Sequence, residues 1–334
     1  MRFKSGKIVK YLLSLALAAV LAWFALKSVD WKAFLEGLAQ TRWGWILLFF
    51  AASIGALVFR TLRWKALLKP LGDCADTLTV WDANNVGNIA NVAVPGSGEF
   101  VRCGYAASGK ARYDRVLGTA VMERIWDVGA IAVLLVLSLA LGWSRFGPFF
   151  IDNIWGPASG RLDFSLWWIV SGALILIAGG VWAVMHWRDR NAFCAKVAGV
   201  FKGLSDGFSS FLKVERKWLF ASYTVGIWTM YILMCFFTMK AVPAISTLGF
   251  ADAMFLSAVG NLASVIPVPG GIGAYHYLVA LSLSSIYGTA WETGILFATL
   301  QHELHAALII ALGIISYLSL TIRKRKNENE TDIA

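Results

Sequence analysis

Six long apolar runs decide what this chain can fold into. A helix that crosses the hydrocarbon layer of a membrane needs about 20 mainly apolar residues. Runs of this kind lie at 8–26, 44–62, 116–141, 166–186, 218–239 and 292–320. With 58% hydrophobic and only 15% charged residues, the chain carries more apolar sequence than one soluble core could bury. We therefore predict an all-α integral membrane protein with about six spanning helices.

The basic residues indicate topology. The net charge of +10 would suggest nucleic acid as a partner of a soluble protein, but here the charges gather at the ends of the apolar runs, so no nucleic acid is expected. They precede the first run, follow the fourth, form the tail at 323–326, and follow the second run as Arg60, Arg63, Lys65 and Lys69. Segment 142–165 has few and is expected to be an outer loop. Both termini are therefore predicted to be cytoplasmic.

The first apolar run allows two interpretations. It resembles a secretory signal peptide, with a basic start and small residues, but we favour a retained span.

The four cysteines, Cys74, Cys103, Cys194 and Cys235, show no CxxC spacing, so no disulfide framework, metal site or thiol chemistry is predicted.

An internal repeat divides the chain into two related halves. The segment VGNIANV at 86–92 returns as VGNLASV at 259–265, and Pro95-Gly96 is matched by Pro269-Gly270. The same shift defines repeat units at about 44–141 and 218–320, in one membrane domain at 1–321 that is followed by a short tail at 322–334. Because the charge pattern sends the two units through the membrane in opposite directions, we predict an inverted repeat, which is typical of transporters.

The middle of each unit is broken by proline and glycine, and the apolar pieces beside the break are too short to cross a membrane. We predict two opposed re-entrant hairpins, one entering over 77–94 and returning by 112, the other entering over 251–266 and returning by 287. Their turns must be buried in protein or face water. The turn residues are Pro95, Gly96 and Gly98 in the first hairpin, and Pro267, Pro269, Gly270, Gly271 and Gly273 in the second.

These motifs resemble one family. Asn88, the turn PGSGE at 95–99, Arg102, ERIWD at 123–127 and PVPGGIG at 267–273 are similar to the flippase-like membrane domain of lysylphosphatidylglycerol synthetases, which includes the membrane half of the multiple peptide resistance factor. The resemblance covers nearly the whole chain and implies a lipid translocase of the bacterial cytoplasmic membrane. Full-length members carry a cytosolic aminoacyl-transferase domain, whereas about a dozen hydrophilic residues follow Thr321 here. We therefore expect no enzyme activity, no catalytic residues and no cofactor.

The charged residues of the third run are the first candidates for a site. A single charge at the centre of a spanning helix costs about 2.5–3.5 kcal/mol, so Glu123, Arg124 and Asp127 should pair and face protein or water. Either they bind substrate or they form an ion-pair network that only locks the helices. Glu99 could contact a cationic headgroup or a coupling proton, or merely stabilise the helix dipole. Arg102 could hold a lipid phosphate, or pair with Glu99 at i,i+3.

Other polar residues within apolar segments extend this set. Asn88 and Asn261, matched by the repeat, are expected to brace the hairpins, while Asn91 braces or hydrates a lipid path. Gln301, His302 and Glu303 in the sixth run could form a proton relay, line a polar path or brace helices. The sequence His302-Glu303-Leu304-His305 is one residue short of the HExxH zinc motif, so no metal site is predicted.

The combined prediction is a lipid translocase whose two hairpins form a polar groove for the headgroup of a phospholipid or polyprenyl-phosphate lipid. Membrane lipids are the expected partners, together with partner membrane proteins or further copies of the chain. An ion-coupled small-solute transporter would use the same repeat logic. A membrane partner protein that transports nothing is the third alternative.

Overall fold

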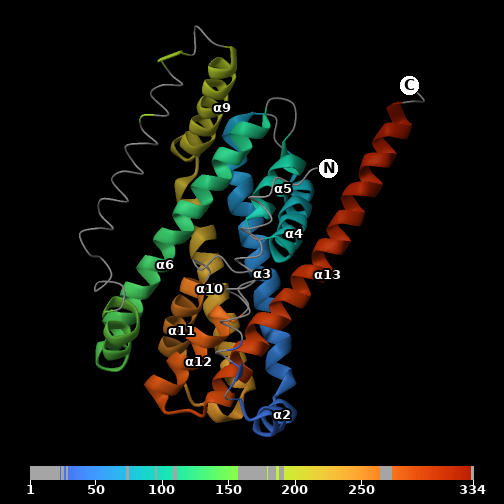
Figure 1. The fold of residues 1–334 in the computed structure, drawn as a ribbon. Coiled ribbons are helices and arrows are strands. Elements are labelled where there is room, and N and C mark those ends of the chain that lie inside the picture. Colours follow the sequence, from blue (N-terminus) through green and yellow to red (C-terminus); the bar gives the residue numbers. More distant parts are fainter. Residues whose placement is uncertain are drawn as a thin grey trace.

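The structure is a computed structural model that describes residues 23, 26–27, 29–72, 75–94, 96–107, 111–156, 179, 186–187, 192–263 and 273–331. Within these ranges the chain forms helices and contains no strand, which confirms the all-α fold (Figure 1). Short 3-10 turns accompany the α-helices at η1 (Lys69–Leu71), η3 (Ser209–Lys213) and η4 (Pro243–Ile245).

Four of the described helices are long and apolar enough to cross a membrane. They are α3 (Trp43–Leu68), α6 (Tyr113–Phe150), α10 (Lys217–Ala241) and α13 (Trp291–Thr331). Each contains one of the predicted runs at 44–62, 116–141, 218–239 and 292–320. The other two predicted spans, 8–26 and 166–186, lie almost wholly outside the described residues. The chain is a multi-pass membrane protein.

Helix α6 continues beyond its predicted end, so the prediction of an outer loop from Gly142 onward was wrong for its first part. The chain stays helical to Phe150 and then through a π-helical turn, η2 (Ile151–Trp155). Gly142 departs from helical dihedral angles (φ −148°, ψ 41°) and kinks the helix. Beyond the kink the ring of Phe146 stacks on Phe255 with centroids 4.3 Å apart. This buried contact explains why the segment folds back onto the bundle instead of forming a loop.

The predicted entry and return segments of the first hairpin are helices α4 (Thr77–Ala93) and α5 (Ser97–Ala106), which pack against each other. Gly96 takes the left-handed conformation (φ 79°), which favours glycine. Helix α5 then crosses α4 so closely that a Cβ at Gly98 would overlap the carbonyl oxygen of Gly87. The backbone N–H of Gly98 donates to Asn91 Oδ1 at 2.8 Å. These contacts fix a tight helical hairpin.

The corresponding segments in the second half are α11 (Phe250–Leu262) and α12 (Ala274–Tyr287). Asp252 caps α11, since its Oδ2 accepts the backbone N–H of Gly249 at 2.8 Å. Gly273, the last predicted turn residue, has a positive φ of 84° directly before α12. The other predicted turn residues of this hairpin, Pro267, Pro269, Gly270 and Gly271, lie outside the described residues, as Pro95 does in the first.

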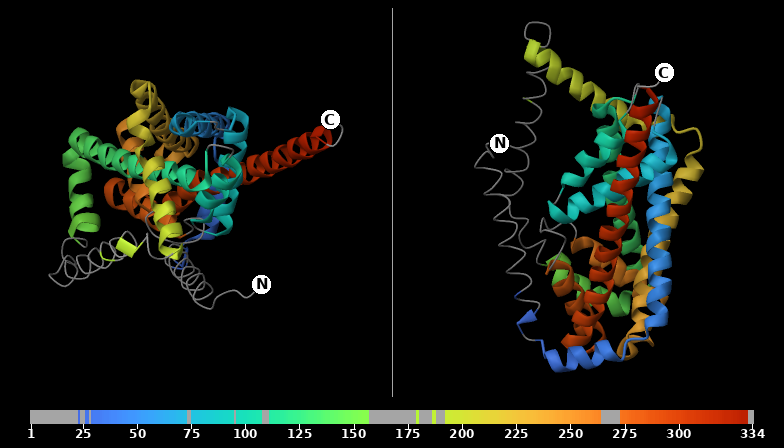
Figure 2. Two further views of the ribbon diagram at one scale, coloured as in Figure 1. Left: turned by 90° about the horizontal axis from the view of Figure 1, so that it is seen from above. Right: turned by 90° about the vertical axis from the view of Figure 1, so that its right-hand side faces the viewer.

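Both predicted repeat units contain the same order of elements, a long helix, two shorter helices and a second long helix. Figures 1 and 2 show α4 and α5 toward one end of the bundle and α11 and α12 toward the other. Helix α2 (Trp31–Ala39) lies at the end that holds α11 and α12 (Figure 1). The inverted symmetry and the re-entrant placement in a membrane stay predictions, which this arrangement supports.

Helix α9 (Ala192–Phe208) packs against the start of α6, and the two backbones approach each other closely at one crossing. A Cβ at Gly207 would overlap the carbonyl oxygen of Arg115, and one at Gly118 would overlap that of Leu204. Small residues at such a crossing let membrane helices approach closely. The seam between α6 and α9 is therefore a backbone-to-backbone contact.

Candidate functional site

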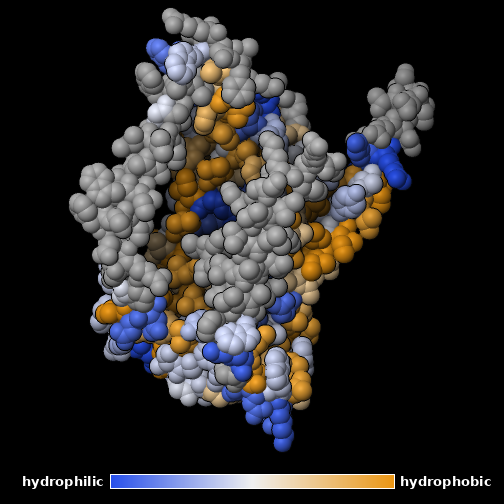
Figure 3. All heavy atoms as spheres, viewed as in Figure 1, coloured by the Kyte–Doolittle hydropathy of each residue, from blue (hydrophilic) through white to orange (hydrophobic). Residues whose placement is uncertain are grey.

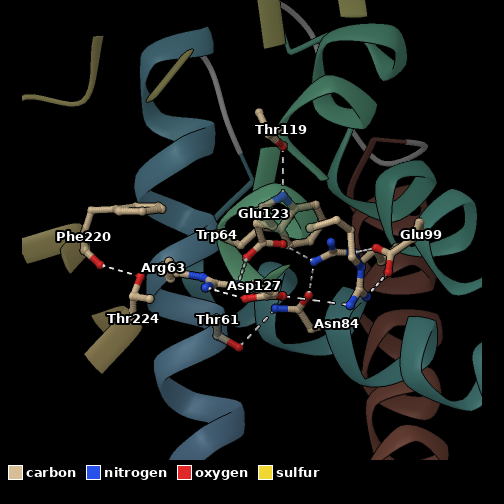
Figure 4. A network of polar contacts seen from close by, with 12 residues as sticks. Thr61, Arg63, Trp64, Asn84, Glu99, Thr119, Glu123, Asp127, Phe220 and Thr224 are labelled. Atoms are coloured by element: carbon tan, nitrogen blue, oxygen red, sulfur yellow. Dashed lines mark hydrogen bonds and ion pairs between the residues drawn. The ribbon is translucent and has the colours of Figure 1, made fainter. Parts of the chain in front are cut away.

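Two arginines and two carboxylates form a buried ionic network between α3, α5 and α6 (Figure 4). Arg63 of α3 ion-pairs with Asp127 at 2.7 Å and with Glu123 at 3.4 Å. Arg102 of α5 approaches the other oxygen of Glu123 at 2.7 Å. Because removing one partner of a buried ion pair costs about 3–5 kcal/mol, this network holds the first helix pair against both long helices of its unit.

The predicted position of Arg63, at the cytoplasmic end of the second span, was wrong. Together with Arg60 it was interpreted as a cytoplasmic charge beyond the second span, but both lie inside α3, and Arg63 is 1% exposed. The sequence did carry a signal, because residues three apart share one helix face, and Arg60 and Arg63 have this spacing. The bridge between Glu123 and Asp127 comes from Arg63, while the predicted bridging residue Arg124 lies 3.9 Å from Asp127.

Glu99 joins this network from the first turn of α5. Its carboxylate accepts from Arg102 Nε at 2.6 Å and also pairs with Arg124 of α6. Arg102 in addition donates to Asn84 Oδ1 at 2.9 Å and lies over the Trp64 ring. Arg102 is 4% exposed, and its guanidinium group already has protein partners, including Glu99 at i,i+3. Its predicted contact with a lipid phosphate stays a prediction, and this environment gives it little support.

The charges in this region do not balance. Four guanidinium groups, from Arg60, Arg63, Arg102 and Arg124, stand beside three carboxylates, from Glu99, Glu123 and Asp127. Arg60 is the one of the four that has neither a hydrogen bond nor an ion pair with any residue in the described ranges. It is half-buried and faces a cavity. A cation without a partner inside a membrane helix bundle is costly, so this position favours an anion.

The cavity has a volume of about 730 Å³ and lies among the helices of both repeat units. All eight helices of the two units contribute side chains or backbone to its wall. Figure 3 shows a recessed group of hydrophilic atoms beside hydrophobic ones. The predicted site residues that line the cavity are Asn88, Asn91, Gly96, Glu99, Arg124, Asp127, Asn261, Gln301 and His302. Arg102, Glu123 and Glu303 are not part of the lining.

The predicted bracing residues differ in their contacts. Asn91 braces the α4–α5 hairpin through Gly98, as described above. Asn261 donates from Nδ2 to the Ser257 carbonyl oxygen of its own helix at 2.8 Å. Asn88 Nδ2 is buried without a hydrogen-bond acceptor among the described residues. Because Asn88 also lines the cavity, its amide is a free donor next to the space that a ligand would fill.

The polar residues of α13 have different partners from one another. Gln301 accepts from the Thr238 hydroxyl at 2.6 Å, and His305 Nδ1 lies 2.7 Å from the Ser53 hydroxyl oxygen. His302 Nδ1 lies 3.1 Å from Glu303 Oε1. The structure adds His276 of α12, whose Nε2 is 3.8 Å from the same carboxylate oxygen.

His276 was missed by sequence reasoning, although the repeat contained a signal. It follows Pro269 at the distance at which Arg102 follows Pro95, so both are polar residues on the returning helix of a hairpin. Each faces a glutamate of the last long helix in its unit, Glu123 in the first and Glu303 in the second.

Comparison with protein families gives a match to the family described as the lysylphosphatidylglycerol synthase TM region, over residues 11–313. The matched range includes the first repeat unit, the second unit as far as residue 313, and every residue of the cavity lining. It confirms the resemblance that the sequence motifs indicated. No curated protein and no solved structure matches the chain.

Proposed function

Because the chain belongs to the family of lysylphosphatidylglycerol synthase TM regions, we propose that it moves a phospholipid or a polyprenyl-phosphate lipid between the leaflets of a bacterial cytoplasmic membrane. The family membership supports a function in membrane lipid chemistry. The observation that carries the finer proposal is Arg60, an unpaired cation on the wall of a cavity inside the helix bundle.

A lipid phosphate is the anion that fits this position. A guanidinium group binds phosphate with two parallel N–H donors, and the amide of Asn88 is a further unused donor on the same wall. The cavity volume of about 730 Å³ is in the range of small-molecule sites. In the proposed mechanism the headgroup occupies this polar cavity, and the acyl chains stay in the surrounding lipid.

Helix length supports re-entrant hairpins as the frame of this cavity. At 1.5 Å per residue, α4 with its 17 residues spans about 25 Å, and α5 with its 10 residues about 15 Å. Helices α11 and α12 have 13 and 14 residues and span about 20 Å each. All four are shorter than the hydrocarbon core of about 30 Å. We therefore place the two helix pairs as hairpins that enter from opposite sides and end at the cavity.

Lipid movement in proteoliposomes tests the proposal. Fluorescent phosphatidylglycerol in the inner leaflet becomes accessible to a membrane-impermeant quencher only if the protein moves it outward. We expect Arg60→Gln to slow this movement about tenfold or more, the effect of losing a charge-assisted hydrogen bond worth about 1.5–3 kcal/mol. Arg115→Gln is the matched control, because Arg115 is half-exposed, pairs with Asp206 and lies outside the cavity lining.

Three outcomes would overturn the proposal. Lipid movement by Arg60→Gln at the wild-type rate would remove the phosphate role of Arg60. Uptake of a small anion without lipid movement would identify a solute transporter. If wild-type protein catalyses neither process, the chain acts as a partner protein rather than a translocase.

A further inference from the structure

Three potential metal ligands from two helices converge beside the cavity. They are His276 of α12 and the neighbouring His302 and Glu303 of α13. One ligand atom from each lies within 4.8 Å of the other two. His276 is 7% exposed, whereas the Glu303 side chain is 47% exposed. The cluster therefore extends from the protein interior to an accessible surface.

The distance between His276 and Glu303 suits a shared ion better than a direct hydrogen bond. His276 Nε2 is 3.8 Å from Glu303 Oε1, which is too long for a hydrogen bond. Two ligand atoms on one tetrahedral zinc ion, with bonds of about 2.0–2.1 Å, lie about 3.4 Å apart. The distances of 3.8 Å and 3.1 Å from His276 and His302 to this oxygen bracket that value. Small side-chain rotations would bring all three groups onto one ion.

Neither ring nitrogen of His276 has a hydrogen-bond partner among the described residues. Its Nδ1 is buried without a hydrogen-bond partner, and no hydrogen bond of Nε2 is present either. A buried polar group without a partner costs about 1–3 kcal/mol. The hydrogen bond between His302 and Glu303 accounts for two members of the cluster but leaves His276 unexplained. An ion bound by all three would explain it.

The aromatic rings around the cluster lie close to one another. Tyr275 lies against His302 with ring centroids 5.3 Å apart, and the rings of His276 and His302 are 5.4 Å apart. The close packing of α12 on α13 includes Gly294, where a Cβ would lie 2.7 Å from Ala280 Cα. The two helices therefore hold the three ligand side chains close together, which a metal site requires.

We propose that His276, His302 and Glu303 bind a divalent transition-metal ion, with zinc as the best fit to two imidazoles and one carboxylate. Three protein ligands leave a fourth position open, and His302 lines the cavity. The open position would face the space in which a headgroup is proposed to lie. Metal binding itself does not depend on lipid movement, so the two proposals can fail separately.

This site differs from the zinc motif that the sequence suggested and excluded. In the HExxH pattern both histidines come from one helix. Here His305, the second histidine of the α13 sequence, lies beside the hydroxyl of Ser53 and outside the cluster. The third ligand comes instead from α12, so the spacing within α13 carries no information about it.

Zinc binding to the purified full-length chain tests the proposal. The chain has four histidines, so His186 and His305 provide matched controls for His276 and His302. Protein isolated through a tag without histidine is equilibrated with zinc chloride, and bound zinc is measured by mass spectrometry. We expect a single zinc ion per chain, bound about tenfold or more weakly after His276→Ala, His302→Ala or Glu303→Gln. His186→Ala and His305→Ala should bind as wild type does.

Absence of bound zinc in the wild-type chain would overturn the proposal, as would equal losses in the control variants. Cobalt chloride provides a second measurement, because ligation by the cluster gives visible absorption bands that the three ligand variants should lose. Glu303→Gln conserves side-chain volume at a half-exposed position. If His276→Ala does not fold, Glu303→Gln still tests whether the cluster binds zinc. Unchanged zinc binding by Glu303→Gln would contradict the proposal.

Discussion

Arg63 and Asp127 form a 2.7 Å ion pair that joins α3 to α6 in the interior of the bundle. The pair connects the first and the last helix of one repeat unit, and Glu123 shares the same guanidinium group. Arg63 is 1% exposed, so no water can replace its partners. The network is therefore a structural element, and of its four residues Asp127 lines the cavity.

Replacing Arg63 with alanine should destabilise the protein strongly. Two carboxylates would lose their shared cation, at a cost of about 3–5 kcal/mol. We expect a clearly lower thermal unfolding midpoint in detergent, measured by the loss of the monodisperse peak in size-exclusion chromatography after heating. Lys69→Ala is the control. Both residues of the Lys69–Glu215 pair are exposed, so removal of this pair should leave the midpoint unchanged. Equal midpoints for both variants would contradict a structural role of the network.

Gly98→Ala should disrupt the α4–α5 hairpin. The new Cβ would collide with the backbone of Gly87 and with Asn91, and backbone atoms cannot move aside without separating the helices. Gly104→Ala in the same helix meets no atom within 4 Å and should be neutral or stabilising by about 0.5–1 kcal/mol. Thermal unfolding of both variants measures the difference. A Gly98→Ala variant as stable as Gly104→Ala would show that the close approach is not required.

Re-entrant hairpins predict a particular pattern of thiol labelling. In a chain whose four cysteines are replaced by serine or alanine, Thr77→Cys and Arg112→Cys mark the two ends of the first helix pair. Thr247→Cys and Ala290→Cys mark the ends of the second, and all four positions are exposed. A membrane-impermeant maleimide should label the first two from one side of the membrane and the last two from the other. Labelling of Thr77→Cys and Arg112→Cys from opposite sides would mean that the first pair spans the membrane.

The start of α4 should respond to acid. A hydrogen bond from Thr79 holds the pKa of Asp76, the N-cap of this helix, below its ordinary value of 3.8. Because the folded state lowers this pKa, the cap stabilises the fold above pH 3.8 and loses that effect as the pH falls through the depressed pKa. The unfolding midpoint of wild type should therefore exceed that of Asp76→Ala at pH 7, and the difference should shrink toward pH 3. A constant difference would contradict this assignment.

The hairpin helices could be predicted from sequence because their signals are local. Pro95, Gly96 and the Gly/Pro-rich partner segment break the helical pattern wherever the rest of the chain goes. The ionic cluster of α6 was also predictable, because Glu123 and Asp127 within an apolar run must find partners. Such rules identify which residues need a partner, and they apply before any tertiary contact is known.

The identity of the partners could not be predicted in the same way. Basic residues near the end of an apolar run indicate topology in most membrane helices, so Arg60 and Arg63 were assigned to the membrane surface. Their burial depends on α3 continuing to Leu68 and packing on α6. His276 likewise becomes a candidate ligand only because α12 packs on α13. Long-range packing decided both cases.

The backbone contact between α6 and α9 limits where a lipid could enter or leave the bundle. At Gly118 and Gly207 the two helices have no room even for a methyl group. An acyl chain cannot pass between the two helices at this crossing while the contact holds. If a lipid headgroup occupies the cavity, as proposed, its tails must leave the bundle between other helices, and labelling and crosslinking should search for that exit there.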